Sequence, residues 1–151
     1  MLHWFCKPFN DLSPKELYEV MKLRSEVFVV EQNCVYQDAD SKDEYCYHLM
    51  GFHENELAAY ARLLPANIAY TYISIGRVVT SPAHRGLGGG KELLTQAIHQ
   101  CYELFGKQAI KIGAQLYLKK LYESFGFKQS GDEYDEDGIP HIPMILDNRS
   151  S

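Results

Sequence analysis

The sequence predicts one domain of the mixed α/β (α+β) class, covering residues 1–151, with a sheet of mixed strand direction. The length of 151 residues is typical of a single domain, and 46% hydrophobic with 23% charged residues is typical of a globular protein. Segments with strand-like and helix-like hydrophobic spacing alternate along the chain. Hairpin-like pairs of strands occur beside strand–helix–strand units, which requires strands of both directions.

The first elements are expected to be a strand and a helix. Residues 2–9 are rich in aromatic side chains and are followed by Asn10, as in a short strand. Ser13, Pro14 and Glu16 then form the pattern of a capping box with proline at the first helical position. Apolar residues at helical spacing extend this helix to about residue 29.

A loop, a hairpin and a further strand are expected next. Residues 31–44 are polar and acidic, so we expect an irregular loop. Residues 45–53 and 56–64 flank a short polar turn and predict an antiparallel hairpin. The β-branched run over 69–80 predicts another strand, which ends before a proline.

The second half is expected to begin with a long helix, because pairs of apolar residues recur every four positions up to Gly106. A strand over 108–114, a short helix over 116–124 and two final strands over 126–131 and 139–146 follow. The last two enclose an acidic loop. The predicted order is therefore strand, helix, three strands, helix, strand, helix and two strands.

Four glycines in five positions precede the long helix, in the segment "HRGLGGGK" over residues 84–91. A strand, a glycine-rich turn and a helix N-terminus together form an anion site, because the first N–H groups of a helix have no partner within it. A Walker A loop is excluded, since Arg85 and Glu92 occupy its first glycine and its Ser/Thr position. A dinucleotide-binding G-x-G-x-x-G fails at Lys91.

The pattern that fits is R-x-x-G-x-G, at Arg85, Gly88 and Gly90, and it resembles the pyrophosphate loop of the GCN5-related N-acetyltransferase superfamily. The segments "VFVVEQNCVYQDAD", "GRVVTSPAHRG", "LYESFGF" and "YDEDGIPHIPM" resemble the ElaA branch of that superfamily and span nearly the whole chain. The resemblance implies the acyl-CoA acyltransferase fold. In that fold a mostly antiparallel central sheet is flanked by helices, and two parallel central strands splay apart around acetyl-CoA.

The resemblance also implies roles for individual residues. The strand residues Val78, Val79 and Thr80 would contact the pantetheine arm, and an N–H near Val78 would stabilise the oxyanion. Tyr122 lies four residues before Gly126 and would act as the general acid on the departing thiolate. Gln115 stands where many members have a CoA-binding asparagine. The expected pyrophosphate contacts are Arg85, Gly86, Leu87, Gly88, Gly89, Gly90 and Lys91.

The resemblance leaves the general base open. Glu31 is the first candidate, because it follows the first helix on the expected acceptor side. His48, Asp40 and His141 are alternatives, although His48 lies in a predicted strand and Asp40 in a loop that it would stabilise. Each would take a proton from the acceptor amine, often through water.

The implied function is transfer of an acetyl group from acetyl-CoA to a primary amine by direct attack in a ternary complex. Residues 38–44 carry a net charge of −3 and residues 132–137 a net charge of −5, which favours a cationic small molecule, a lysine or an N-terminus as acceptor. The alternatives are a non-catalytic CoA-binding module or sensor and, less favoured because of Glu92, a nucleotide-phosphate protein.

Composition sets the remaining expectations. The net charge of −5 argues against a nucleic-acid partner, and no apolar run is long enough to cross a membrane. Four scattered cysteines without zinc-like spacing, and an N-terminus without a signal peptide, predict reduced thiols in a cytoplasmic protein without a metal. Exposed strand edges and the aromatic first strand allow a homodimer.

Overall fold

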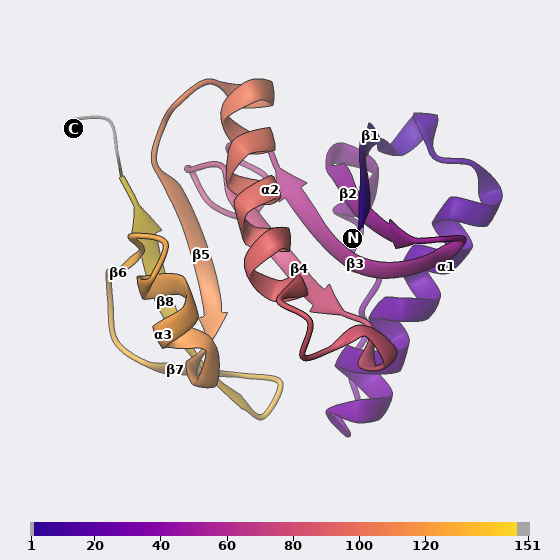
Figure 1. The fold of residues 1–151 in the computed structure, drawn as a ribbon. Helices are drawn as coiled ribbons and strands as arrows, with labels where there is room; N and C mark the ends of the chain where they lie inside the picture. Colours follow the sequence, from indigo (N-terminus) through magenta and orange to yellow (C-terminus); the bar gives the residue numbers. More distant parts are fainter. Residues whose placement is uncertain (1, 148–151) are drawn as a thin grey trace.

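A computed structural model describes residues 2–147 of the chain, which form two sheets and three α-helices (Figure 1). The first sheet is antiparallel, in the order β1-β2-β3-β4. Its strands are β1 (His3–Pro8), β2 (Tyr47–His53), β3 (Glu56–Leu64) and β4 (Ser74–Thr80). The second sheet pairs β5 (Ile110–Gln115) and β6 (Lys128–Gln129) with β8 (Ile139–Leu146), and β7 (Tyr134–Glu136) also pairs with β8.

The two sheets meet at one point between β4 and β5. A single parallel bridge joins Ile73 to Ile110, and the Lys111 N–H donates to the Ile73 carbonyl at 3.0 Å. Beyond this bridge the two strands run in the same direction and diverge, without further ladder pairs (Figure 1). The mostly antiparallel fold with splayed central parallel strands is therefore confirmed.

Helices cover both faces of the first sheet. The helix α1 (Pro14–Arg24) begins with the predicted capping box, in which Ser13 and Glu16 bond reciprocally. Its apolar side chains pack with Phe28 against Met50 and Tyr60. The helix α2 (Gly89–Phe105) covers the other face and ends at Gly106, as predicted. Since both faces are covered, β3 is buried from Leu57 to Leu64.

The structure changes some predicted boundaries. A π-helical segment, Ser25–Glu31, continues α1 beyond the expected end at residue 29. The strand expected over 69–80 begins at Ser74, because residues 65–72 form a turn region in which Asn67 adopts a φ of 70°. The helix expected over 116–124 is a 3-10 turn, Leu116–Leu118, followed by α3 (Lys119–Glu123).

The strand β7 was not predicted. Its sequence is rich in Asp and Glu, which are depleted in strands. The signal that would have found it is Asp137-Gly138, since an Asp-Gly pair favours a two-residue hairpin turn with positive φ at both positions. Asp137 and Gly138 have φ values of 53° and 82°. Part of the acidic loop, Tyr134–Glu136, is therefore one strand of a hairpin with β8.

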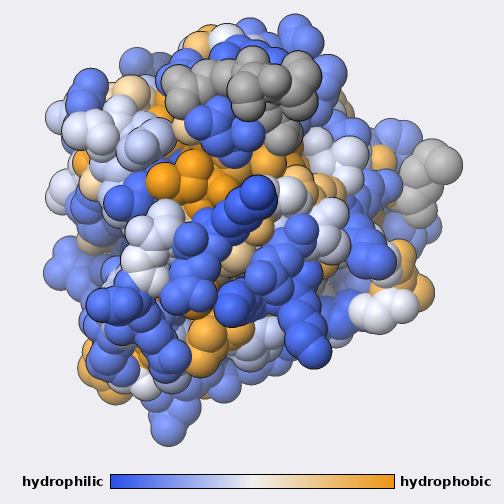
Figure 2. Space-filling view, turned by 90° about the vertical axis from the view of Figure 1, so that its left-hand side faces the viewer, coloured by the Kyte–Doolittle hydropathy of each residue, from blue (hydrophilic) through white to orange (hydrophobic). Residues whose placement is uncertain are grey.

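The end of the molecule formed by the second sheet is mixed in polarity. Figure 2 shows apolar side chains gathered near the centre of this face, with hydrophilic side chains over most of the rest. No helix within residues 2–147 has both the length and the apolar character needed to cross a bilayer.

Candidate active site

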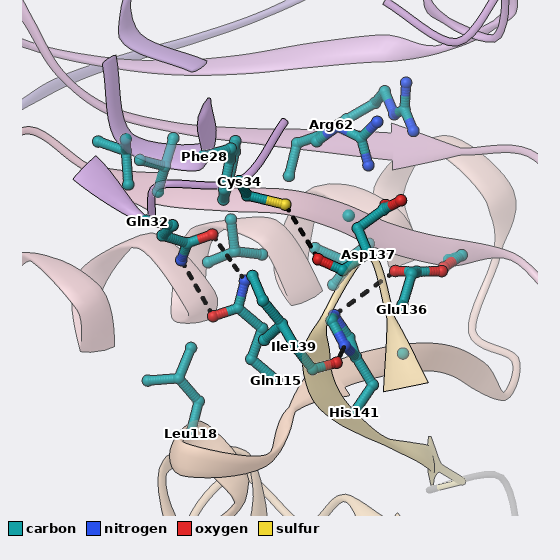
Figure 3. A pocket seen from close by; sticks show the side chains of 18 of the residues that line it. Phe28, Gln32, Cys34, Arg62, Gln115, Leu118, Glu136, Asp137, Ile139 and His141 are labelled. Atoms are coloured by element: carbon teal, nitrogen blue, oxygen red, sulfur yellow. Dashed lines mark hydrogen bonds and ion pairs between the residues drawn. The ribbon is translucent and has the colours of Figure 1, made fainter. Parts of the chain in front are cut away.

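A cleft of about 850 Å³ opens where β4 and β5 separate. Its walls come from segments that are distant in the sequence: the segment after α1, β4, the start of α2, the end of β5, α3 and the β7–β8 hairpin (Figure 3). The splayed strands thus create a space that reaches both the glycine loop and the acidic hairpin.

The glycine loop lies at the N-terminal end of α2. Gly88 is the helix N-cap with a φ of 77°, and Gly86 has a φ of 83°. Of residues 85–91, Arg85 and Gly90 line the cleft, whereas the lining does not include Gly86, Leu87, Gly88, Gly89 or Lys91. A Cβ on Gly90 would meet no atom within 4 Å. The loop therefore presents bare backbone at the start of a helix beside the cleft.

The strand β4 carries a bulge where it borders the cleft. Thr80 and Val79 pair with β3, and so does Gly76, but Arg77 and Val78 have no partner in the register. Arg77 adopts a φ of 50°, which is rare for a residue with a side chain. Val78, Val79 and Thr80 all line the cleft, so the bulge turns the irregular part of the strand toward it.

Gln115 and Tyr122 lie on the opposite wall. Gln115 is the last residue of β5, and its amide oxygen accepts a 3.1 Å hydrogen bond from the Gln32 amide. Tyr122 is 5% exposed and packs edge-on against Phe127, with ring centroids 5.6 Å apart. Burial raises the pKa of the Tyr122 phenol above its usual value, so the hydroxyl stays protonated at neutral pH.

Glu31 also lines the cleft, at the end of the π-helical segment. Its two carboxylate oxygens each accept a 2.6 Å hydrogen bond from the Arg85 guanidinium. These hydrogen bonds and the Arg85 charge hold the pKa of Glu31 below its usual value. Glu31, the first candidate base, is therefore hydrogen-bonded to Arg85 at the start of the glycine loop.

His48 is placed away from the cleft. Its side chain is fully buried, with Nδ1 2.6 Å from the Tyr60 hydroxyl and Nε2 2.9 Å from the Asp43 carbonyl. Burial lowers the pKa of His48. Because both ring nitrogens are engaged in the core, these contacts indicate a structural histidine.

A partly buried network of three arginines and three aspartates was not predicted from the sequence. Arg24 binds Asp43 at 2.6 Å and Asp38 at 2.8 Å. Arg62 binds both oxygens of Asp40 at 2.8 Å and Asp43 at 3.0 Å. The sixth member, Arg77 on the β4 bulge, bonds Asp38 at 2.8 Å.

This network changes the interpretation of the charge carried by the first acidic segment, residues 38–44. The three aspartates of residues 38–44 are paired with arginines from α1, β3 and β4, so the net charge of −3 does not act as free negative charge. Burial opposes the ionised form of Asp40, but its hydrogen bonds and charge pairing with Arg62 hold its pKa well below its usual value. Three of the four acidic side chains of this segment are therefore paired, and the attraction of a cation by both acidic segments stays a prediction.

The β7–β8 hairpin supplies His141, Glu136 and Asp137 to the cleft. His141 is 6% exposed; its Nδ1 lies 2.7 Å from the Ile139 carbonyl and its Nε2 lies 3.5 Å from the Glu136 carboxylate (Figure 3). The Cys34 thiol donates to the Asp137 carbonyl at 3.1 Å. The hairpin is thereby held against the segment that follows α1.

Comparison with known proteins relates nearly the whole chain to one family. The family model of the acetyltransferase (GNAT) domain matches residues 9–148. A UPF0039 protein of Synechocystis sp. is 43% identical over 146 residues, covering 96% of this chain and 95% of that protein. Among solved structures, the crystal structure of Escherichia coli ElaA has a TM-score of 0.91 at 39% identity, covering 97% of this chain and 100% of that chain. An acyl-CoA N-acyltransferase from Pseudomonas aeruginosa has the same TM-score at 40% identity, covering 97% and 99% of the two chains.

A more distant structure shares the fold alone. A GNAT family acetyltransferase from Elizabethkingia anophelis with acetyl-CoA bound has a TM-score of 0.69 at 14% identity, and the match covers 97% of both chains.

Proposed function

The chain belongs to the acetyltransferase (GNAT) family, and on this premise we propose that it transfers an acetyl group from acetyl-CoA to a primary amine. The family match and the relatives also confirm the resemblance to the ElaA branch that the sequence motifs indicated. Acetyl-CoA supplies the activated thioester. The remaining steps are those that the side chains and backbone of this cleft perform.

The observation that carries this proposal is the glycine loop beside the cleft. Helix α2 begins there, and its first N–H groups have no partner within the helix. Open space surrounds the positions where a Cβ would stand on Gly86, Gly88 and Gly90. Such a loop fits a pyrophosphate, because phosphate oxygens reach backbone N–H groups that no side chain covers. The Elizabethkingia anophelis protein, which has acetyl-CoA bound, has the same fold.

Two groups in the cleft suit the chemistry of acyl transfer. The Val78 N–H, on the unpaired part of β4, would stabilise the oxyanion that forms when the amine attacks the thioester carbonyl. The Tyr122 hydroxyl, kept protonated by burial, would donate its proton to the departing thiolate. We propose direct attack in a ternary complex, in which the Cys34 thiol of the cleft carries no acetyl group.

We propose a cationic amine as the acceptor, on the basis of the hairpin rather than of the first acidic segment. The salt bridges among the described residues leave the Asp137 carboxylate unpaired, and Glu136 is 58% exposed beside it. Both carboxylates border the cleft and face a charge-balanced arginine–aspartate network. A polyamine, a lysine side chain or a protein N-terminus fits this charge pattern.

The decisive experiment combines CoA binding with thiol release. We expect millimolar CoA to raise the melting temperature, and acetyl-CoA with a panel of neutral, monocationic and polycationic amines to release free thiol. Intersecting initial-rate patterns and an active Cys34→Ala variant are expected for direct attack. No thermal shift with CoA would contradict the binding proposal, whereas a shift without thiol release from any amine would favour a CoA-binding sensor. Equal rates for neutral and polycationic amines, insensitive to salt, would contradict the cationic acceptor.

A further inference from the structure

We infer that His141 is the catalytic residue that takes the proton from the acceptor amine, with Glu136 stabilising the imidazolium that results. This inference rests on the proposed acetyl transfer. It selects one residue from the four candidates that the sequence left open.

The contacts of the His141 ring determine where its lone pair lies. A carbonyl oxygen accepts hydrogen bonds and cannot donate them, so the 2.7 Å contact with Ile139 requires the proton to be on Nδ1. In the neutral ring, Nε2 therefore carries the lone pair. A histidine held in this tautomer is ready to accept a proton at Nε2 without rotating or exchanging its own.

The ring is also fixed in orientation. Its plane stacks on Tyr134, with centroids 5.7 Å apart and an interplanar angle of 29°. In the β5–β8 ladder His141 pairs with Gln115, the last residue of β5, so it lies at the level where the cleft opens. The same cleft is lined by Val78 and Tyr122, which the proposed mechanism requires. Figure 3 shows the ring between Ile139 and Glu136 at this wall.

Glu136 complements the charge that His141 would gain. Its carboxylate lies 3.5 Å from Nε2 and is 58% exposed, so it is free to attract both the imidazolium and an incoming ammonium group. Two titratable groups face the ring from β7, Glu136 and Tyr134, and β5 contributes the uncharged Gln115. Asp137 adds a further carboxylate at the same edge of the cleft.

The other three candidates are engaged elsewhere. Glu31 is held by two hydrogen bonds from Arg85, and Asp40 by Arg62 and Arg77. A guanidinium partner favours the ionised carboxylate and so weakens it as a base. His48 has both nitrogens bonded inside the core. Among these candidates, His141 alone combines a basic atom that no hydrogen-bond donor occupies with a place on the cleft wall.

The proton balance of the step is complete. The ammonium group of the acceptor gives one proton to Nε2, directly or through water, and the neutral amine forms the C–N bond to the thioester carbonyl. The C–S bond then breaks, and the thiolate takes a proton from the Tyr122 hydroxyl. The new amide nitrogen loses its surplus proton, which restores the phenol by way of water, and the imidazolium releases its proton to solvent.

The test compares His141→Gln with the wild type in the acetyl-transfer assay from pH 6 to pH 10. We expect kcat/KM for the amine to fall by about 100-fold at pH 7 while the Kd for acetyl-CoA is unchanged. The deficit should shrink toward pH 10, because more of the amine is then already neutral. Added imidazole should partly restore a His141→Ala variant. The matched control is His99→Gln, since His99 lies on α2 with its side chain 63% exposed.

A second variant keeps the test decisive if the His141 variants fold poorly. Glu136→Gln removes the exposed carboxylate that lies 3.5 Å from Nε2, so kcat/KM for the amine should fall by up to about five-fold while the Kd for acetyl-CoA is unchanged. If the wild type is active and the His141→Gln rate stays within about three-fold of it at every pH, the role of His141 is overturned and the acetyl-transfer proposal stays intact. A Glu136→Gln rate equal to that of the wild type would overturn the role of Glu136. If the wild type is inactive toward every amine, acetyl transfer itself fails. In that case there is no ammonium proton for His141 to take, and the inference fails with the proposed function.

Discussion

Arg85 and Glu31 connect the glycine loop to the segment that continues α1, through two hydrogen bonds of 2.6 Å. Both side chains are 40% exposed and both residues line the cleft. In the proposed complex Arg85 would also meet the pyrophosphate of CoA. The carboxylate and the pyrophosphate therefore compete for one guanidinium.

This competition predicts that Glu31→Gln binds CoA more tightly than the wild type. The substitution leaves Arg85 without its anionic partner, so the pyrophosphate no longer has to share the guanidinium charge with a carboxylate. Exposed ion pairs are weak, and we expect the Kd for CoA to fall by up to about five-fold. Isothermal titration at low and high salt checks this, with pantetheine, which lacks the pyrophosphate, as the ligand control. Weaker CoA binding by Glu31→Gln would show that the ion pair assists the loop instead.

The second prediction concerns Tyr122. Tyr122→Phe removes the proposed proton donor but keeps the ring that packs on Phe127, so the fold should be preserved. We expect kcat to fall by about 100-fold, with the Kd for CoA changed less than three-fold. Because burial raises the pKa of the Tyr122 phenol, the wild-type profile should lack a basic limb from this group up to about pH 10. The control is Tyr18→Phe, an exposed residue on α1. A Tyr122→Phe enzyme with full kcat would remove this residue from the mechanism.

Local patterns predicted the elements whose signals lie within a few residues. The capping box of Ser13 and Glu16 and the Gly106 end of α2 are local, and both are confirmed. The spacing from Tyr122 to Phe127 also has a local cause, since the Phe127 N–H donates to the Tyr122 carbonyl at 3.2 Å as the chain leaves α3. These signals depend on short-range geometry that the sequence determines directly.

Long-range pairing could not be predicted in the same way. The acidity of residues 38–44 is visible in the sequence, but the partners of Asp43 are Arg24 and Arg62, each 19 residues away. Their pairing requires α1 and β3 to be packed first. Similarly, the contact of His141 with Glu136 depends on a hairpin turn, and the separation of His48 from the cleft depends on which face of β2 is covered by α1. The composition of an acidic segment therefore does not determine its effective charge.

The arginine–aspartate network predicts a loss of stability in acid. Burial would raise the pKa of Asp43, but hydrogen bonds and charge from Arg24 and Arg62 lower it overall, and the pKa of Asp40 is lowered as well. A lowered folded-state pKa contributes stability that is fully present above the unfolded value, near pH 4, and is lost as the pH falls below it. Urea unfolding at pH 7, 4 and 2.5 should show this decline.

Asp43→Asn tests whether this network is the cause. The variant leaves Arg24 buried with one partner fewer, and we expect the free energy of unfolding at pH 7 to fall by about 3 kcal/mol. The difference from the wild type should shrink as the pH falls below the unfolded value, because the stability that the lowered pKa of Asp43 contributes is lost there. Asp132→Asn, at an exposed position, is the control and should follow the wild type at each pH. A constant difference across the pH range would assign the effect to packing rather than to ionisation.

The last prediction separates the structural from the binding role of the glycine loop. Gly90 lies in the first turn of α2, its φ is not positive, and a Cβ there would meet no atom within 4 Å. Gly90→Ala should therefore leave the melting temperature unchanged or slightly raised, because alanine favours the helix over glycine.

CoA binding should respond differently, because a bound pyrophosphate would lose its close approach to the backbone at residue 90. Since hydrogen bonds to charged groups contribute about 1.5–3 kcal/mol, losing one should raise the Kd for CoA about 10- to 100-fold. Thr95→Ala, on the same helix, is the control. If Gly90→Ala binds CoA as the wild type does, the ligand does not contact this turn, and the glycines serve the turn alone.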